Sequence, residues 1–185
     1  MEKQYETQAT RDALYLGNSL WVRLHNGVHF KRHYSGSANS KGVPKRVAVL
    51  PFKGDPKISV QATDQFTAGL SVVGFEVVDA SLIDAAAGRP SLPSSGALDI
   101  DTRNDLRRTL GVQGVFIGSI TGESRLLWVD SHLNIRLVSL DTGAVVWGAE
   151  VHDPRGTTVS MDVRTSATYA VKNALKILAK DLSAR

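Results

Sequence analysis

The sequence of 185 residues contains no cysteine. Disulfide bridges, thiol nucleophiles and cysteine-ligated metal sites are therefore excluded for this chain. Long apolar runs are also missing, so the sequence predicts no transmembrane helix. The first residues lack the apolar stretch of a signal peptide. We expect either a cytoplasmic protein or a mature exported protein in which Met1 stands in place of a leader.

Positive charge is concentrated near the N-terminus. The chain has a formal net charge of +4, and residues 1–57 hold ten Lys and Arg against four Asp and Glu. Arg23, Lys31 and Arg32 belong to this excess. The segment is either a solvated arm or a surface for an anionic partner, such as lipid headgroups, an acidic polysaccharide or nucleic acid. Nucleic acid is the least expected of these partners, because the sequence contains no RNA-binding motif.

The N-terminal quarter has two interpretations. Apolar residues at spacings of three and four predict a helix over residues 8–25. The alternative is a hairpin in which Asn26-Gly27 turns the chain between strands at 20–25 and 28–33. Residues 35–44 have the Gly/Ser-rich composition of a linker. We therefore predict an N-terminal arm and linker at 1–44 and a folded domain at 45–185.

The remainder of the chain alternates between strand and helix patterns. The predicted elements are a strand at 46–52, a helix at 59–73, a strand at 75–79, a short helix at 82–87, a helix at 102–110 capped by Asp101, a strand at 112–120, a hairpin over 133–151 and a long helix at 157–182. The order β-α-β-α-α-β-β-β-α predicts an α/β fold with a mixed sheet, a C-terminal antiparallel hairpin and helices packed on it. Trp147 is expected to fill the space between the sheet and the last helix.

Three segments together resemble one known family. The strand at 47–52 ends in Leu50-Pro51-Phe52, the segment 110–121 runs from a helix end into Gly-Ser-apolar-Thr, and the hairpin at 135–147 turns through Asp-Thr-Gly and closes on Trp. Their order and spacing resemble the CsgG-like domain of bacterial envelope lipoproteins, which includes PelC, LpoB and the N-terminal domain of TolB. The family fold is similar to an anticodon-binding domain.

This resemblance implies a non-enzymatic scaffold of a cell-envelope machine for export or for appendage assembly. It implies a periplasmic homo-oligomeric ring, anchored to the outer membrane through a lipid on a cysteine absent from this chain, with other envelope proteins as partners. Two alternatives remain open: a monomeric module that activates a peptidoglycan synthase, and a cytoplasmic nucleic-acid-binding module.

Neither catalysis nor a cofactor is predicted. His25, His29 and His33 are regularly spaced, but Gly27 interrupts any helix there and no nearby carboxylate completes a ligand set. We interpret them as a basic surface and predict no metal site. Asp99 and Asp101 precede a helix, so capping explains them without acid–base chemistry.

The connection at 122–130 supplies the remaining interaction candidates, Arg125, Leu127 and Trp128. An aromatic residue in a short loop is either a lid over the core or an anchor for a partner or membrane interface. The connection is also too short for the long membrane hairpin of a CsgG pore. The sequence therefore predicts a scaffold that is not itself a channel.

Overall fold

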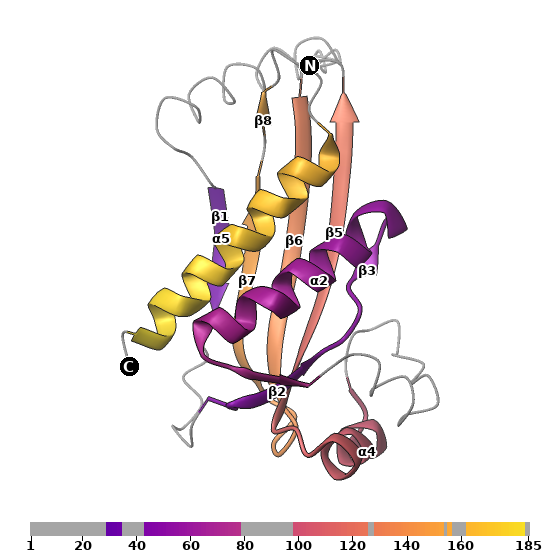
Figure 1. Cartoon of the computed structure of the whole chain (residues 1–185), viewed down its shortest axis with the longest axis vertical. Coiled ribbons are helices and arrows are strands. Elements are labelled where there is room, and N and C mark those ends of the chain that lie inside the picture. Colours follow the sequence, from indigo (N-terminus) through magenta and orange to yellow (C-terminus); the bar gives the residue numbers. More distant parts are fainter. Residues whose placement is uncertain are drawn as a thin grey trace, which may run out of the picture.

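The computed structural model describes residues 29–34, 43–78, 98–125, 128–153, 155–156 and 162–183. Residues 29–34, 125, 128, 155 and 156 are described through their backbone only. Within these residues a mixed sheet has the strand order β1-β7-β6-β5-β2-β4, with β3 paired to β5 and β8 paired to β6 (Figure 1). The strands are β1 (His29–Tyr34), β2 (Arg46–Val49), β3 (Lys53–Gly54), β4 (Glu76–Val78), β5 (Gly114–Arg125), β6 (Trp128–Ser139), β7 (Val145–His152) and β8 (Arg155–Gly156).

The predicted mixture of parallel and antiparallel strands is confirmed. β2 runs parallel to both β4 and β5, because helical crossovers connect them along the chain. β5, β6 and β7 form an antiparallel meander, with a tight turn at Asp141-Thr142-Gly143 between the last two strands. β5 is buried on both of its faces at Val115, Phe116 and Ile117, as its continuous apolar run predicts.

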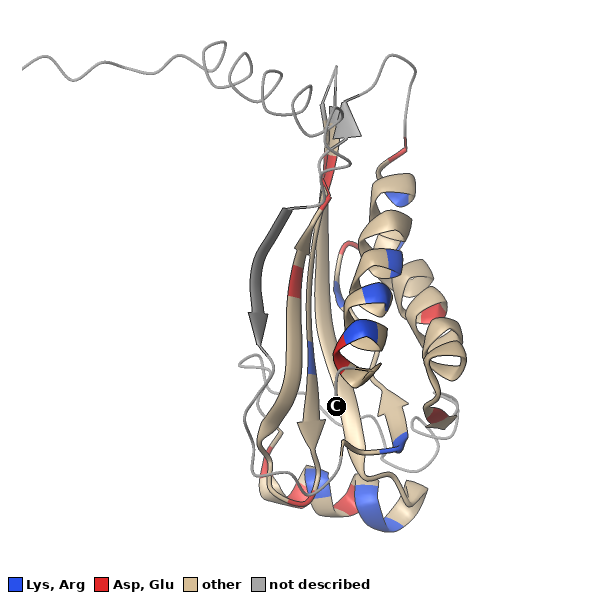
Figure 2. Ribbon diagram, turned by 90° about the vertical axis from the view of Figure 1, so that its left-hand side faces the viewer, with Lys and Arg blue, Asp and Glu red and all other residues tan. Residues whose placement is uncertain are grey.

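Two helices cover one face of the sheet, which we call the helical face. They are α2 (Pro56–Val73) and α5 (Val163–Ser183), and Figure 2 shows both on the same side of the strands. α2 begins at Asp55, whose carboxylate accepts the backbone N–H of Lys57, and ends at Gly74 in the left-handed conformation. Phe66 of α2 and Trp147 of β7 both pack edge-on against Phe116 at the centre of this core. The predicted place of Trp147 is confirmed.

A third helix, α4 (Ile100–Leu110), lies at one end of the opposite face and closes a second, smaller core with Val115 and Ile117. The predicted cap of this helix was wrong by two residues. Asp99 rather than Asp101 has extended backbone angles, and its carboxylate accepts the backbone N–H of Thr102. Asp101 lies in the first helical turn, where its charge favours the helix dipole.

The connection predicted as a loop at 122–130 is largely strand. β5 and β6 stay paired up to Arg125 opposite Trp128, so only two residues separate the strands. Gly122 makes this extension compatible with the helical face, because a Cβ there would lie 2.3 Å from Cγ2 of Val163 at the start of α5. The absence of a side chain thus lets the helix start directly on the strand.

The N-terminal segment contributes a strand to the sheet. β1 pairs antiparallel with β7 along the side away from β6. It overlaps the second strand of the predicted alternative hairpin, whereas the helix predicted at 8–25 and the short helix at 82–87 lie outside the described residues. Among the described residues, no helix combines the length and the hydropathy needed to cross a membrane.

Candidate functional site

Strand alternation gives the central sheet two different faces. On β6, Leu133 and Ile135 point into the core under α5, while Asp130, His132 and Asn134 belong to the opposite face. We call this opposite face, beyond α4, the polar face. It carries Asp130, His132, Asn134 and Arg136 on β6 and Glu150 and His152 on β7. Apart from α4 at one end, no described helix covers the polar face (Figure 2).

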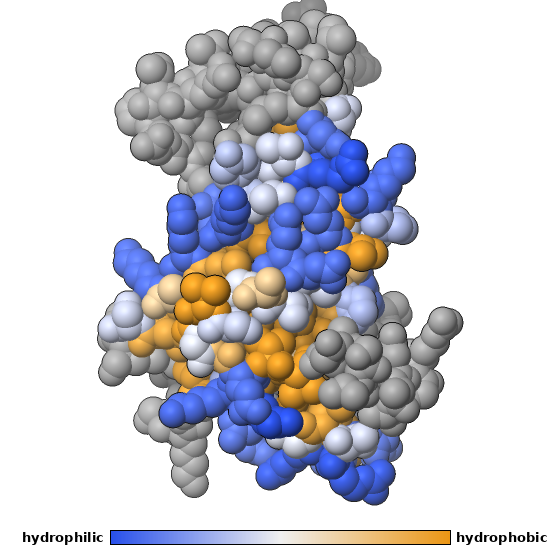
Figure 3. Space-filling model, in the orientation of Figure 1, coloured by the Kyte–Doolittle hydropathy of each residue, from blue (hydrophilic) through white to orange (hydrophobic). Residues whose placement is uncertain are grey.

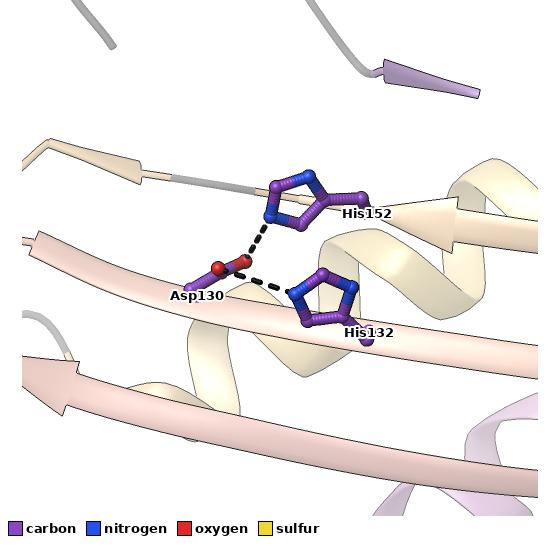
Figure 4. A group of neighbouring side chains, drawn as sticks. All are labelled: Asp130, His132 and His152. Carbon is purple, nitrogen blue, oxygen red and sulfur yellow. Dashed lines mark ion pairs between the residues drawn. The ribbon is translucent and has the colours of Figure 1, made fainter. Parts of the chain in front are cut away.

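Three of these side chains form a compact group, the His–Asp cluster of Asp130, His132 and His152. His132 and His152 are directly opposite each other in the β6–β7 register. Their rings are stacked, with centroids 4.1 Å apart and planes 10° from parallel. Asp130 precedes His132 by two residues and therefore shares its face. Its Oδ1 lies 2.6 Å from Nε2 of His152, and its Oδ2 lies 3.3 Å from Nε2 of His132 (Figure 4).

Burial differs sharply within the cluster. The Asp130 side chain is 7% exposed and that of His152 is 13% exposed, whereas that of His132 is 46% exposed. A carboxylate removed from water in this way requires charged or hydrogen-bonding partners. Both imidazoles present Nε2 to it, and an imidazole nitrogen either donates a hydrogen bond or, when unprotonated, coordinates a metal. The cluster is thus a partly buried polar site with one side open to solvent.

A hydrogen-bonded chain on the helical face holds the strands of the cluster in place. Ser131, between Asp130 and His132, has its Oγ 2.8 Å from Oγ of Ser166 on α5. Ser166 Oγ in turn donates to the carbonyl oxygen of Asp153, which follows His152, at 2.6 Å. The backbone N–H of Asp153 donates to the carbonyl of Ser131. Residues adjacent to all three cluster members are therefore fixed to α5.

A depression of about 450 Å³ lies on the sheet beside the cluster, and its lining includes Asn134 and Glu150, the next same-face pair along β6 and β7. Ser119, Asn134, Arg136 and Glu150 line it, and its floor includes Gly148. Gly148 pairs with Arg136, so the absence of a side chain at that position opens the space. The lining is mostly polar, which suits a hydrated ligand or a polar surface of a partner.

The residues proposed from sequence as an interaction surface occupy two separate places. Lys31 and Arg32 lie on β1, next to β7. Arg125 and Trp128 form the last pair of the β5–β6 hairpin. Arg23 and Leu127 lie outside the described residues. The common role assigned to these residues stays a prediction.

The His–Asp cluster was not predicted from sequence, although the signal for it existed. His132 and His152 lie one residue beyond the two ends of the predicted hairpin at 133–151. Counting back from the turn at 141–143, with one bulge between Leu137 and Val138, brings positions 132 and 152 opposite each other. The sequence itself gives no indication of this bulge. His29, one of the three regularly spaced histidines, pairs through its backbone with His152 in the β1–β7 register.

Comparison with known proteins is informative at the level of structure only. No protein-family model and no curated protein sequence matches the chain. The PelC dodecamer from Paraburkholderia phytofirmans superposes with a TM-score of 0.55 at 16% identity, covering 83% of this chain and 98% of that one. Lipoprotein GNA1162 from Neisseria meningitidis has a TM-score of 0.53 at 19% identity, covering 72% and 97%.

A third similar structure is the hypothetical protein CT253 from Chlamydia trachomatis, with a TM-score of 0.53 at 10% identity. It covers 76% of this chain and 99% of that one. The fold expected from the resemblance to envelope lipoproteins is therefore confirmed. At these identities the likeness establishes the fold, and function requires further argument.

Proposed function

We propose that the protein is a non-enzymatic scaffold of a bacterial cell-envelope machine and works as a homo-oligomer. The observation that carries this proposal is the structural match to a PelC dodecamer, which includes 98% of the PelC chain. The match is therefore to nearly the whole subunit of a dodecamer rather than to a common substructure within it. No catalytic reaction is assigned, because the sequence offers neither a thiol nucleophile nor a phosphate-binding loop.

A location in the periplasm follows from the same proposal. GNA1162 is named a lipoprotein, and the match covers 97% of its chain. By analogy this protein is held at the outer membrane by a lipid on a cysteine that the present chain lacks. Its partners are then other proteins of the export or assembly machine, with an anionic polymer or lipid headgroups facing the basic N-terminal segment.

Subunit contacts require apolar surface, and α2 exposes some. Val72 is 89% exposed and Val60 is 62% exposed, although both belong to a helix whose other side is fully packed. Figure 3, in the orientation of Figure 1, shows apolar areas among the charged side chains over the helical face. Isolated exposed valines are common on monomers, so the mass of the particle in solution must show whether the chain forms an oligomer.

Sedimentation velocity and native mass spectrometry over a wide range of protein concentration test the proposal. We expect a closed assembly of one discrete mass, because ring contacts are head-to-tail and saturate when the ring closes. A strict monomer at every concentration would contradict the scaffold and favour the regulatory module instead.

A pair of charge variants locates the contact. Val72→Asp places a carboxylate on the exposed apolar position, and Ser71→Asp places the same charge on the neighbouring exposed residue. If Val72 lies in the subunit interface, only the first variant shifts the assembly towards smaller particles. If neither variant changes the mass of the assembly, the subunit contact lies on another surface and the homo-oligomer proposal stands.

A further inference from the structure

The His–Asp cluster has the composition of a metal site. Two imidazole nitrogens and one carboxylate oxygen lie within 4.8 Å of one another, on adjacent strands of one sheet. We propose that Asp130, His132 and His152 bind a Zn²⁺ ion on the polar face of the sheet. This proposal goes beyond the scaffold function and does not depend on it, because all three ligands come from one chain.

The donor set selects the class of metal. Ca²⁺ and Mg²⁺ take oxygen ligands almost exclusively, whereas imidazole nitrogen favours zinc and its transition-metal neighbours. Zn²⁺ accepts His nitrogen at about 2.0–2.1 Å and carboxylate oxygen at about 2.0–2.2 Å, in tetrahedral geometry. Three protein ligands leave the fourth position for water or for a group from a partner. The depression lined by Asn134 and Glu150 continues from that side of the sheet.

The present geometry needs one adjustment to receive the ion. Both Nε2 atoms point at the Asp130 carboxylate, but the rings are parallel, so their lone pairs do not meet at one point (Figure 4). His132 must rotate out of the stacked arrangement so that its Nε2 lone pair and that of His152 point at the same ion. Its side chain is 46% exposed, which leaves room for this rotation, whereas Asp130 and His152 are held by burial. The ion then takes the place of the contacts between the imidazoles and the carboxylate.

The competing explanation is that the histidines only satisfy a buried carboxylate. Hydrogen bonds from imidazole to Asp130 would then suffice, and added metal would change nothing. The two explanations predict different numbers of bound metal ions, different Co²⁺ spectra and different effects of replacing each histidine. An experiment can therefore separate them.

Isothermal titration calorimetry with Zn²⁺ tests the assignment directly. The sample is the full 185-residue chain, free of any histidine-containing tag and treated with a chelator beforehand. We expect one tightly bound Zn²⁺ per chain in the wild type. Since loss of an outer partner of a metal ligand already weakens binding by about 10–100-fold, loss of a ligand itself should weaken it by at least about 100-fold. His132→Ala and His152→Ala are both expected to show this loss.

His33→Ala is the matched control, because its backbone pairs with Ala149 rather than with His152. It removes one of the five histidines and is expected to bind Zn²⁺ like the wild type. His132→Gln covers the case in which truncation at the buried His152 unfolds the chain, since His132 is half exposed and circular dichroism verifies its fold. Co²⁺ bound in place of zinc should give the visible absorption of a tetrahedral site, and His132→Gln should lose it.

Wild-type protein that binds no Zn²⁺ at millimolar concentration would overturn the proposal. So would a loss of binding in His33→Ala equal to that in His132→Gln, because adventitious surface histidines would then hold the ion. A metal-dependent rise in melting temperature, present in wild type and absent in His132→Gln, would support the site, since a ligand that binds only the native state stabilises it.

Discussion

The indole Nε1–H of Trp147 on β7 donates to Oδ2 of Asp181 on α5 across 2.9 Å. The two residues are 34 positions apart in the sequence. Trp147 is 2% exposed and also packs edge-on against Phe116, with ring centroids 6.2 Å apart. One side chain therefore joins the aromatic core to the last turns of the final helix, and holds the C-terminal helix on the sheet that carries the His–Asp cluster.

Replacing Trp147 by Phe keeps an aromatic ring but removes the donor and part of the buried volume. We expect a loss of about 1–3 kcal/mol in the free energy of unfolding, from the broken hydrogen bond and the small cavity together. Asp181→Asn is the matched variant, because its amide oxygen still accepts from the indole and a smaller loss is expected. Denaturant titration measures both. Wild-type stability for Trp147→Phe would show that the bond contributes nothing.

The central elements of the fold were predictable because each has a strong local pattern. The helical stripe of α5 and the alternation along β6 leave little choice of structure. The N-cap of α4 was less predictable, since Asp99 and Asp101 are both good caps and only the backbone angles decide between them. The strand extension to Arg125 was missed because Gly122 and its polar neighbours have the composition of a loop.

The site was harder to predict because it depends on pairing rather than on periodicity. His132 and His152 become neighbours only through the register of β6 and β7, and that register contains a bulge at Leu137 and Val138. A slip of one residue would turn His152 into the core. The histidines at regular sequence spacing were the more visible pattern, yet local spacing alone does not assemble a site from separate strands.

The chain of Ser131, Ser166 and the Asp153 carbonyl lends itself to a double-mutant cycle. Ser166→Ala removes both bonds of the chain, for an expected loss of about 1–3 kcal/mol in unfolding free energy, whereas Ser131→Ala leaves the bond from Ser166 to the Asp153 carbonyl intact and should cost less. The double variant should cost clearly less than the two single losses combined, because both remove the same bond. Chemical denaturation of the four proteins gives the coupling, and strict additivity would mean that the hydroxyl–hydroxyl bond contributes no coupling.

Alanine substitutions at Gly54 and Gly74 separate two effects on stability, a steric clash of the new Cβ and the strain of a left-handed backbone. Both glycines have positive φ, at 136° and 103°. A Cβ at Gly54 would lie 1.8 Å from the carbonyl oxygen of Ile120, a backbone atom that cannot move without breaking the β3–β5 pairing, whereas a Cβ at Gly74 meets nothing within 4 Å.

Gly74→Ala should therefore cost only the left-handed strain, about 1–2 kcal/mol, and Gly54→Ala distinctly more. Melting temperatures of the two variants, measured side by side, give the order. Equal destabilisation would show that β3 can leave the sheet without consequence for the rest of the fold.

The Asp99 cap predicts a dependence of stability on pH. The backbone N–H of Thr102 and then its hydroxyl donate to the Asp99 carboxylate, and these bonds lower the pKa of Asp99 below its ordinary value of 3.8. The folded state thus stabilises the ionised form of the Asp99 carboxylate. Its contribution is complete above the unfolded pKa and disappears as the pH falls through the lower, folded value.

Asp99→Asn retains an oxygen that can accept from Thr102 but does not titrate. The stability advantage of the wild type over this variant should therefore be constant near neutral pH and vanish in strong acid. Carboxyl NMR gives the pKa of Asp99 directly, and denaturation at a series of pH values gives the stability difference. Asp101→Asn controls for the loss of one negative charge in the same turn, since it leaves both Thr102 bonds intact. An advantage that persists unchanged in strong acid would mean that the carboxylate charge does not stabilise α4.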